Sequence, residues 1–253
     1  MVEATERCVT MAEGDAHVVT ERQPRPSAQA PRFSFLIADD HPPVTMAVSL
    51  MLREVAGIES PAPACFTRSD KLLAACTLPA PAPRIVILDL VMPGKLKRAA
   101  LVRALHNVAP DARILAYTAD ESAFLAQAVM DGGAMGYVAK TSPANELMDA
   151  LRAIQANKRH VDRYIDLDSV KDHPWRSLTE SERSVLLAFS RGARASAMVA
   201  ASGRSYSTVT THKYNGLKKL NLRDSSGLVP YLHANGLIWE LDEDADEGIP
   251  QKP

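Results

Sequence analysis

Five short apolar runs, each followed by a segment with helical spacing, fill the chain from residue 33 onward, and this alternation restricts the possible folds more than any other feature. The third run, residues 84–89, is almost continuously apolar, as expected for a strand buried on both faces of a parallel sheet. Parallel strands need a crossover connection between them, and a helix usually supplies it. The sequence therefore predicts an α/β domain over residues 33–156, with a five-stranded parallel sheet covered by helices on both faces.

The rest of the chain divides by composition. Residues 1–32 mix charges with prolines and have no sustained period, so we expect a flexible extension. Residues 157–176 are polar and lack a dominant period, which is typical of an interdomain linker. A second, helical pattern covers residues 177–239, and an acidic tail, residues 240–253, follows it.

The helical pattern has clear start and stop signals. Thr179, with Glu182 three residues later, forms a capping box, which marks the start of a helix. A short helix then ends at Gly203, and Ser205 caps a longer polar helix. A final helix is expected from about residue 225 to 234, weakened by Pro230 in its interior. Short helix, glycine turn and longer helix together predict an all-α helix-turn-helix domain.

The net charge of −1 hides an asymmetry along the chain. The segment from Trp175 to Trp239 contains nine basic and three acidic residues, which gives it a net charge of +6. The tail after Trp239 holds six acidic residues and one lysine, a net charge of −5. A basic helical domain in a nearly neutral chain is the electrostatic pattern of a DNA-binding protein.

On the longer helix, Thr210, Thr211 and Tyr214 share a face away from the apolar residues, so we expect them to contact bases. Lysines of the same helix are expected to contact phosphate. The alternative is a solvated helix face with ordinary surface charges. The residues expected at a DNA interface are Ser205, Thr208, Thr210, Thr211, Lys213, Tyr214 and Lys218.

Other classes of protein fit the sequence poorly. No apolar run approaches the ~20 residues of a membrane-spanning helix, and the first residues lack the apolar core of a secretory signal. Cys8, Cys65 and Cys76 lie far apart without a C-x-x-C pair. The seven histidines are scattered singly, which argues against a metal held by nitrogen ligands. We expect a cytoplasmic protein with no contact to membranes.

Polar side chains stand where the expected strands end. Asp39 and Asp40 follow the first strand and Asp89 ends the third, so three carboxylates are expected at one edge of the sheet. Like charges raise one another's pKa unless a cation is present, and Mg²⁺ suits this set of oxygen ligands. Thr118 closes the fourth strand and Lys140 the fifth, which adds a hydroxyl and an ammonium. The set predicts a phosphoacceptor site: Asp89 attacks a phosphoryl group, and Thr118 and Lys140 hold its oxygens.

Each of these residues also has an ordinary structural interpretation. Asp39 and Asp40 could serve as turn residues before two prolines, Asp89 as a strand-end cap and Lys140 as a surface charge. Their order favours the site, because each stands at the end of a separate expected strand.

These motifs resemble a known family. The sequences FLIADDHP at 35–42, ILDLVMPG at 87–94, Tyr117–Thr118 and GAMGYVAK at 133–140 are similar to the receiver domain of bacterial response regulators. Leu178 to Glu182, Gly192, Thr208–Val209, His212 and Lys219–Leu220 are similar to the LuxR-type helix-turn-helix of the NarL/FixJ class. Gly203 to Ser205 resemble, less specifically, the RcsB-type branch.

The resemblance covers residues 33 to about 235 and implies a flavodoxin-like receiver joined to a DNA-binding domain. It implies a two-component response regulator, not an enzyme, whose Asp89 accepts phosphate from a sensor histidine kinase or phosphotransfer protein. Asp39, Asp40 and Asp89 would bind Mg²⁺, and Thr118, Lys140 and Tyr137 would respond to phosphorylation. The implied partners are promoter DNA and a second regulator, in a homodimer or heterodimer.

One departure from the family leaves alternatives open. Lys97 stands where the family usually has glycine, so the loop over the site is expected to differ. A phosphorylation-independent auxiliary regulator with a vestigial receiver is one alternative. A phosphatase with an aspartyl intermediate is another, although Val91 occupies the place of its second acid.

Overall fold

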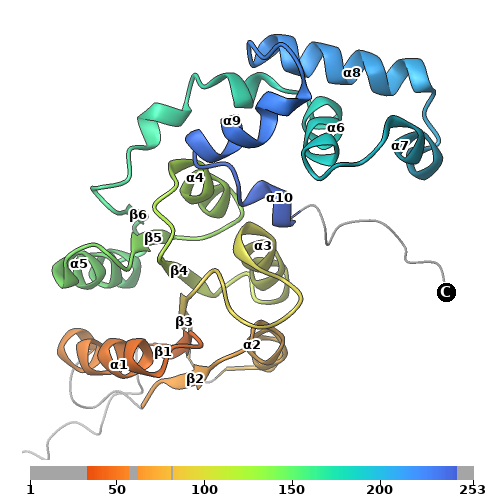
Figure 1. Ribbon diagram of the computed structural model, residues 1–253. Coiled ribbons are helices and arrows are strands. Elements are labelled where there is room, and N and C mark those ends of the chain that lie inside the picture. Colours follow the sequence, from red (N-terminus) through yellow and green to blue (C-terminus); the bar gives the residue numbers. More distant parts are fainter. Residues whose placement is uncertain (1–32, 57–61, 81, 244–253) are drawn as a thin grey trace, which may run out of the picture. The chain divides into compact units, whose positions relative to one another are not determined.

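The computed structural model describes residues 33–56, 62–80 and 82–243, so the expected extension at 1–32 lies outside the described residues. A parallel sheet forms the centre of the first domain, with strand order β2-β1-β3-β4-β5-β6 (Figure 1). Its strands are β1 (Ser34–Ala38), β2 (Ala64–Phe66), β3 (Arg84–Leu88), β4 (Arg113–Thr118), β5 (Gly136–Ala139) and β6 (His160–Val161). Its helices are α1 (Pro42–Ala56), α2 (Ser69–Cys76), α3 (Arg98–Val108), α4 (Ala123–Asp131) and α5 (Ala144–Gln155).

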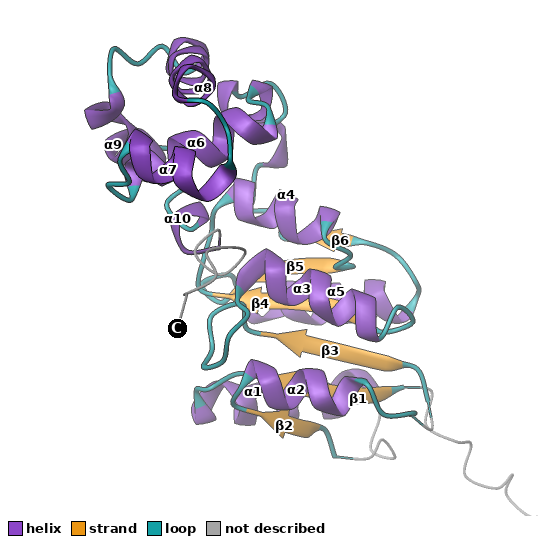
Figure 2. Ribbon diagram, turned by 90° about the vertical axis from the view of Figure 1, so that its right-hand side faces the viewer, coloured by secondary structure: helices purple, strands orange, loops and turns teal. Residues whose placement is uncertain are grey.

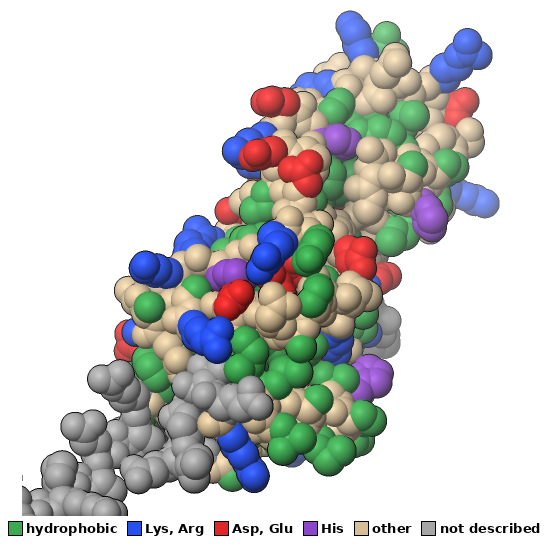
Figure 3. Space-filling model, turned by 90° about the vertical axis from the view of Figure 1, so that its left-hand side faces the viewer, with side chains coloured by type: hydrophobic (Ala, Val, Ile, Leu, Met, Phe, Trp, Pro, Cys, Tyr) green, Lys and Arg blue, Asp and Glu red, His purple; other side chains and the backbone are tan. Residues whose placement is uncertain are grey.

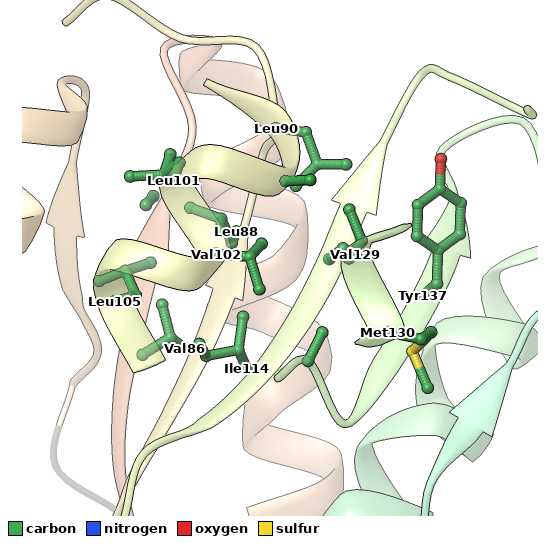
Figure 4. Packing of buried hydrophobic residues seen from close by; sticks show 14 of the residues in the cluster. Val86, Leu88, Leu90, Leu101, Val102, Leu105, Ile114, Val129, Met130 and Tyr137 are labelled. Carbon is green, nitrogen blue, oxygen red and sulfur yellow. The ribbon is translucent and has the colours of Figure 1, made fainter. Parts of the chain in front are cut away.

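Helices cover both faces of the sheet, as the apolar runs predict (Figure 2). In β3, Val86 and Leu88 pack with residues of α2, α3 and α4, whereas Ile85 and Ile87 pack with residues of α1 and α5. Successive side chains of a strand point to opposite faces, so a strand between two helical layers must be apolar throughout. Figure 4 shows Val86 and Leu88 beneath Leu101 of α3.

The sheet has a sixth strand that the sequence does not predict. His160–Val161 pairs in parallel with β5, through bonds from the amide of His160 to the carbonyl of Met135 (2.9 Å) and from that of Asp162 to the carbonyl of Tyr137 (2.9 Å). A strand of two residues shows no period in a sequence, so the pairing partner alone defines it. The expected linker therefore begins as part of the parallel sheet, and continues with η1 (Leu167–Val170) and η2 (Pro174–Ser177).

The remaining helices surround a separate apolar core. It is built from buried side chains that include Trp175, Leu186, Leu217 and Leu228. Gly216 lets α8 approach α6 closely, because a Cβ there would lie 2.8 Å from the Leu186 side chain. No described helix has the length and apolar character needed to cross a membrane. These helices are α6 (Glu180–Ser190), α7 (Ala195–Ser202), α8 (Tyr206–Lys219), η3 (Ser225–Gly227), α9 (Leu228–Ala234) and α10 (Glu240–Glu243).

The end of the chain differs from expectation in two ways. The last long helix begins at Leu228, so Pro230 lies in its first turn, where a missing amide hydrogen costs little. The expected interior break is therefore absent. Residues 240–243, expected within an acidic tail, form α10, and Glu240 is buried and accepts a hydrogen bond from Trp175 Nε1 (2.7 Å). Residues 244–253 lie outside the described residues.

The capping box at the start of α6 forms as predicted. Thr179 Oγ1 accepts from the amide of Glu182 (3.2 Å), and Glu182 Oε2 accepts from the amide of Thr179 (2.8 Å). The same carboxylate accepts from Lys219 Nζ (2.7 Å), which joins α6 to the end of α8. Burial raises the pKa of Glu182, but the bonds from Lys219 and Thr179 outweigh it, so the pKa lies below its usual value.

We expect Glu182→Gln to lower the free energy of unfolding at neutral pH by about 1–2 kcal/mol, because a charged hydrogen-bond acceptor is lost. A lowered pKa in the folded state means that the contribution is present above the carboxyl group's unfolded pKa and disappears as pH falls through the folded value. The deficit should therefore shrink in acid. Urea denaturation at several pH values measures it, with Glu180→Gln, in the same turn and exposed, as the control. Equal stability of the two variants at neutral pH would contradict this role.

Candidate functional site

The parallel register brings two carboxylates and one ammonium together at the carboxyl edge of the sheet. Ala38 pairs with Leu88, so Asp39 and Asp89, the residues after β1 and β3, are neighbours. The amide of Asp89 donates to the carbonyl of Ala38 (2.7 Å). Lys140, after β5, places its Nζ 2.7 Å from Asp39 Oδ2 and 2.7 Å from Asp89 Oδ2. Three of the predicted strand-end residues, Asp39, Asp89 and Lys140, are therefore in direct contact.

The cluster includes one residue that sequence reasoning set aside, His41. Its amide and its Nδ1 lie 2.9 Å and 3.0 Å from Asp39 Oδ1, and the Nδ1 lies 3.1 Å from Asp40 Oδ1. That oxygen of Asp40 is buried and accepts no hydrogen bond. Asp39, Asp40, His41 and Asp89 offer ligand atoms within 4.8 Å of one another. The signal available in the sequence was the position of His41 directly after the acid pair.

The electrostatics of the cluster favour a bound cation. Burial raises the pKa of Asp89, and the Asp39 carboxylate adds to this, against the hydrogen bonds from Lys140 and the amide of Val91. Burial lowers the pKa of Lys140, but the bonds to Asp39 and Asp89 raise it by more, so the lysine stays charged. The ammonium of Lys140 thus pairs with two carboxylates, and Asp40 adds a third carboxylate to the cluster. A group of oxygen ligands with excess negative charge suits a hard divalent ion.

Thr118 and Tyr137, expected to respond to the site, both bond the backbone of Asp120. Thr118 ends β4 and is buried, and its Oγ1 accepts from the amide of Asp120 (3.4 Å). Tyr137 (Figure 4) is fully buried, and its hydroxyl donates to the carbonyl of Asp120 (2.7 Å). Burial raises the pKa of Tyr137, as does the Asp120 carboxylate, so the phenol stays protonated. The two residues are thereby linked through the loop between β4 and α4.

The loop after Asp89 accommodates Lys97 without strain at that residue. Lys97 has extended backbone (φ −136°), which any residue adopts, and the left-handed conformation falls on Arg98 (φ 50°) instead. Gly94 is the position that requires glycine, because it has φ 138° and a Cβ there would collide with the Ser69 hydroxyl. The left-handed residue of this loop is therefore Arg98, one position after Lys97.

The second candidate surface is the outer side of α8. Val209 and Leu217 are buried, whereas Thr210, Thr211 and Tyr214 are exposed, with Tyr214 at 67%. The face expected from the spacing is therefore open to solvent. Asn215, which the sequence analysis does not name, and Lys218 are exposed on the same helix.

Several of the expected interface residues also have contacts within the domain. Ser205 Oγ accepts from the amide of Thr208 (3.1 Å), as predicted for the helix cap. Thr210 Oγ1 donates to the carbonyl of Tyr206 (2.9 Å). Lys213 Nζ lies 4.2 Å from the centroid of the Phe189 ring, an attractive cation–π contact. The ammonium of Lys213 is thus directed at α6 rather than away from the domain.

Comparison with known proteins agrees with the geometry of the first domain. Residues 35–152 match the family model of the response regulator receiver domain. The chain is 28% identical over 215 residues to a putative transcriptional regulator of Pseudomonas aeruginosa, covering 80% of this chain and 98% of that protein. It is 26% identical over 210 residues to the response regulator GacA of Pseudomonas protegens, covering 80% and 96%.

Similar solved structures include both domains. One is RcsB from Salmonella enterica serovar Typhimurium bound to promoter rprA in the presence of the phosphomimetic BeF3⁻. It is 25% identical to this chain, with a TM-score of 0.55, and the match covers 79% of this chain and 97% of that one.

We expect Lys140→Met to lower the free energy of unfolding by about 3 kcal/mol at neutral pH, because it leaves two buried carboxylates without their shared cation. The loss should diminish as pH falls, since protonation removes the repulsion. Urea denaturation followed by circular dichroism measures both effects. Lys71→Met, an exposed lysine of α2, is the matched control. If the two variants were equally stable, Lys140 would not balance the site.

Proposed function

Because this chain belongs to the LuxR-type response regulators, with a receiver domain over residues 35–152, we propose that phosphorylation of Asp89 controls its binding to promoter DNA. The phosphodonor is a sensor histidine kinase or a phosphotransfer protein. The observation that carries the proposal is the ammonium of Lys140, shared at 2.7 Å between Asp39 and Asp89 at the carboxyl edge of a parallel sheet. This is the place where α/β sheets bind ligands.

The residues of the site have separate roles in phosphoryl transfer. Asp89 acts as the nucleophile, held by the amide of Val91 on one oxygen (3.1 Å) and by Lys140 on the other (2.7 Å). Lys140 and the hydroxyl of Thr118 bind oxygens of the transferred group. Mg²⁺, when held by Asp39, Asp40 and Asp89, neutralises charge between the carboxylates and the phosphoryl group. The buried Oδ1 of Asp40, which accepts no hydrogen bond, and the short distances between the ligand atoms of the cluster support this ligand set.

A surface for the phosphodonor lies beside the site. α1 begins at Pro42, one residue beyond the acid pair, and Met46 (66% exposed) and Leu50 (57% exposed) leave its outer side apolar. Hydrophobic side chains gather on the lower part of the face shown in Figure 3, where α1 lies. Exposed apolar side chains of this size favour contact with another protein, and their position fits a donor that must reach Asp89.

The DNA-binding proposal rests on α8. Thr211, Tyr214 and Lys218 follow one another at helical spacing on its exposed side, in a domain with a net charge of +6 between Trp175 and Trp239. A helix with this exposure can enter the major groove, with Thr and Tyr side chains near bases and lysine near phosphate. Ser205 and Thr208 would place the start of α8 near the DNA backbone. Lys213 remains a candidate, although Phe189 competes for its ammonium.

Acetyl phosphate with Mg²⁺ should label the wild-type protein and Asp70→Asn, but not Asp89→Asn. Asp70 is an exposed acid of α2 outside the cluster. Asp40→Asn should reduce Mg²⁺-dependent labelling, because a ligand loses its charge. Intact-protein mass spectrometry measures the added phosphate. Labelling of Asp89→Asn at the wild-type level would refute the assignment, and a wild type that takes no phosphate would favour an auxiliary regulator.

Lys218→Ala should weaken binding to all DNA sequences alike and reduce the slope of log K against log salt by about one unit. Thr211→Ala should instead reduce discrimination at one base pair, by about 1–3 kcal/mol. Fluorescence anisotropy with specific and random duplexes separates the two effects. Lys213→Ala is the matched lysine control and should change the slope less. A change in sequence preference caused by Lys218→Ala alone would require a different orientation of α8.

A further inference from the structure

The outer edge of β5 is covered by the chain's own linker. β6 pairs with β5 along Gly136↔His160 and Tyr137↔Val161, and η1 packs against α4. Ile165 and Val170, in the linker segment after β6, are buried. The surface between α4 and α5, on which a phosphorylated receiver would act, is therefore occupied by the segment that leads to the helical domain.

One buried carboxylate, Asp162, joins this linker to the loop that carries Lys140. Asp162 is 1% exposed. Its Oδ2 accepts from the amide of Ala139 (3.0 Å) and from the hydroxyl of Ser142 (2.5 Å), the residues on either side of the Lys140 segment. Its Oδ1 accepts from the amide of Tyr164 in the linker (3.0 Å). A single side chain thus bonds the site loop and the linker at once.

A second buried acid holds the linker by other partners. Glu146 of α5 is 1% exposed and contacts His160 Nε2 (2.9 Å) and Arg163 Nε (2.6 Å). Both partners are linker residues, and neither belongs to the loop around Lys140. The linker is consequently attached to α5 by Glu146 and to the site loop by Asp162.

We propose that Asp162 is a positioning residue that passes movement of the Lys140 loop to the linker. The inference rests on the proposed function, since a phosphoryl group on Asp89 is what draws Lys140 away from Asp39. Displacement of the main chain between Ala139 and Ser142 moves both donors to Asp162. The carboxylate follows because a buried acceptor that loses its donors is costly, and the linker moves with it.

The experiment compares hydrogen exchange of the full-length protein with and without saturating beryllofluoride and Mg²⁺. Fluorine NMR establishes the adduct at Asp89 independently of the linker. In the wild type, the adduct should change exchange of the amides of residues 160–170 by about fivefold or more, the lower end of usual coupling between sites. A wild type that forms no adduct would overturn the proposed function and this inference with it.

In Asp162→Ala the adduct should form, but the ratio of exchange rates with and without it should fall to near one for residues 160–170. Ser142→Ala, which removes one donor and keeps the carboxylate, should reduce the ratio and serves if Asp162→Ala does not fold. Asp166→Ala is the matched control, because Asp166 caps η1 within the linker through the amides of Asp168 and Ser169. A merely structural role would raise exchange in both states and leave the ratio unchanged. A ratio in Asp162→Ala equal to that of the wild type would therefore refute the proposal.

Discussion

Lys140 places one ammonium between two buried carboxylates, and the arrangement around the site depends on that shared charge. Parallel pairing of β1 with β3 makes Asp39 and Asp89 neighbours whatever their chemistry. Burial raises the pKa of Asp89, so its ionised form needs a positive group within contact distance. Lys140 supplies that group and leaves the cluster with excess negative charge, since Asp40 belongs to it as well. The same features that stabilise the folded cluster therefore make it receptive to a divalent ion and, through that ion, to a phosphoryl group.

The position of Lys140 also determines which segments contact the site and would move with it. It follows β5, whose other side is paired with β6, so the loop carrying the ammonium is the boundary between the site and the linker. Its amide donates to the carbonyl of Thr118 (2.7 Å), and Thr118 contacts the loop that Tyr137 also bonds. The site is thus connected to the start of α4 through Thr118 and Asp120, and to β6 through β5.

The sequence predicts those parts of this arrangement that depend on local pattern and strand polarity. Asp39, Asp89 and Lys140 follow strands with clear apolar runs, and Thr118 ends another such strand. Parallel strands bring these ends to one edge of the sheet. The cap at Thr179 depends on four consecutive residues, so it could be predicted from the sequence as well. Contacts that join segments distant in the sequence could not be predicted in this way. β6 has two residues and no period, and the contact of Lys213 with Phe189 depends on how α6 and α8 pack. His41 was missed because its ring acquires a role only beside the acid pair.

The two buried acids that hold the linker differ in the segments that their partners come from, and this explains why one transmits movement and the other restrains it. Glu146 accepts from the backbone amide and the side chain of Arg163 and contacts the His160 ring, and all three of these groups belong to the linker. Asp162 is bonded by the backbone amide of Ala139 and the short side chain of Ser142, donors whose positions the loop fixes. A buried carboxylate cannot exchange such donors for water without a large cost in free energy. Its position is therefore set by the loop beside Lys140, and a residue so placed moves when that loop moves.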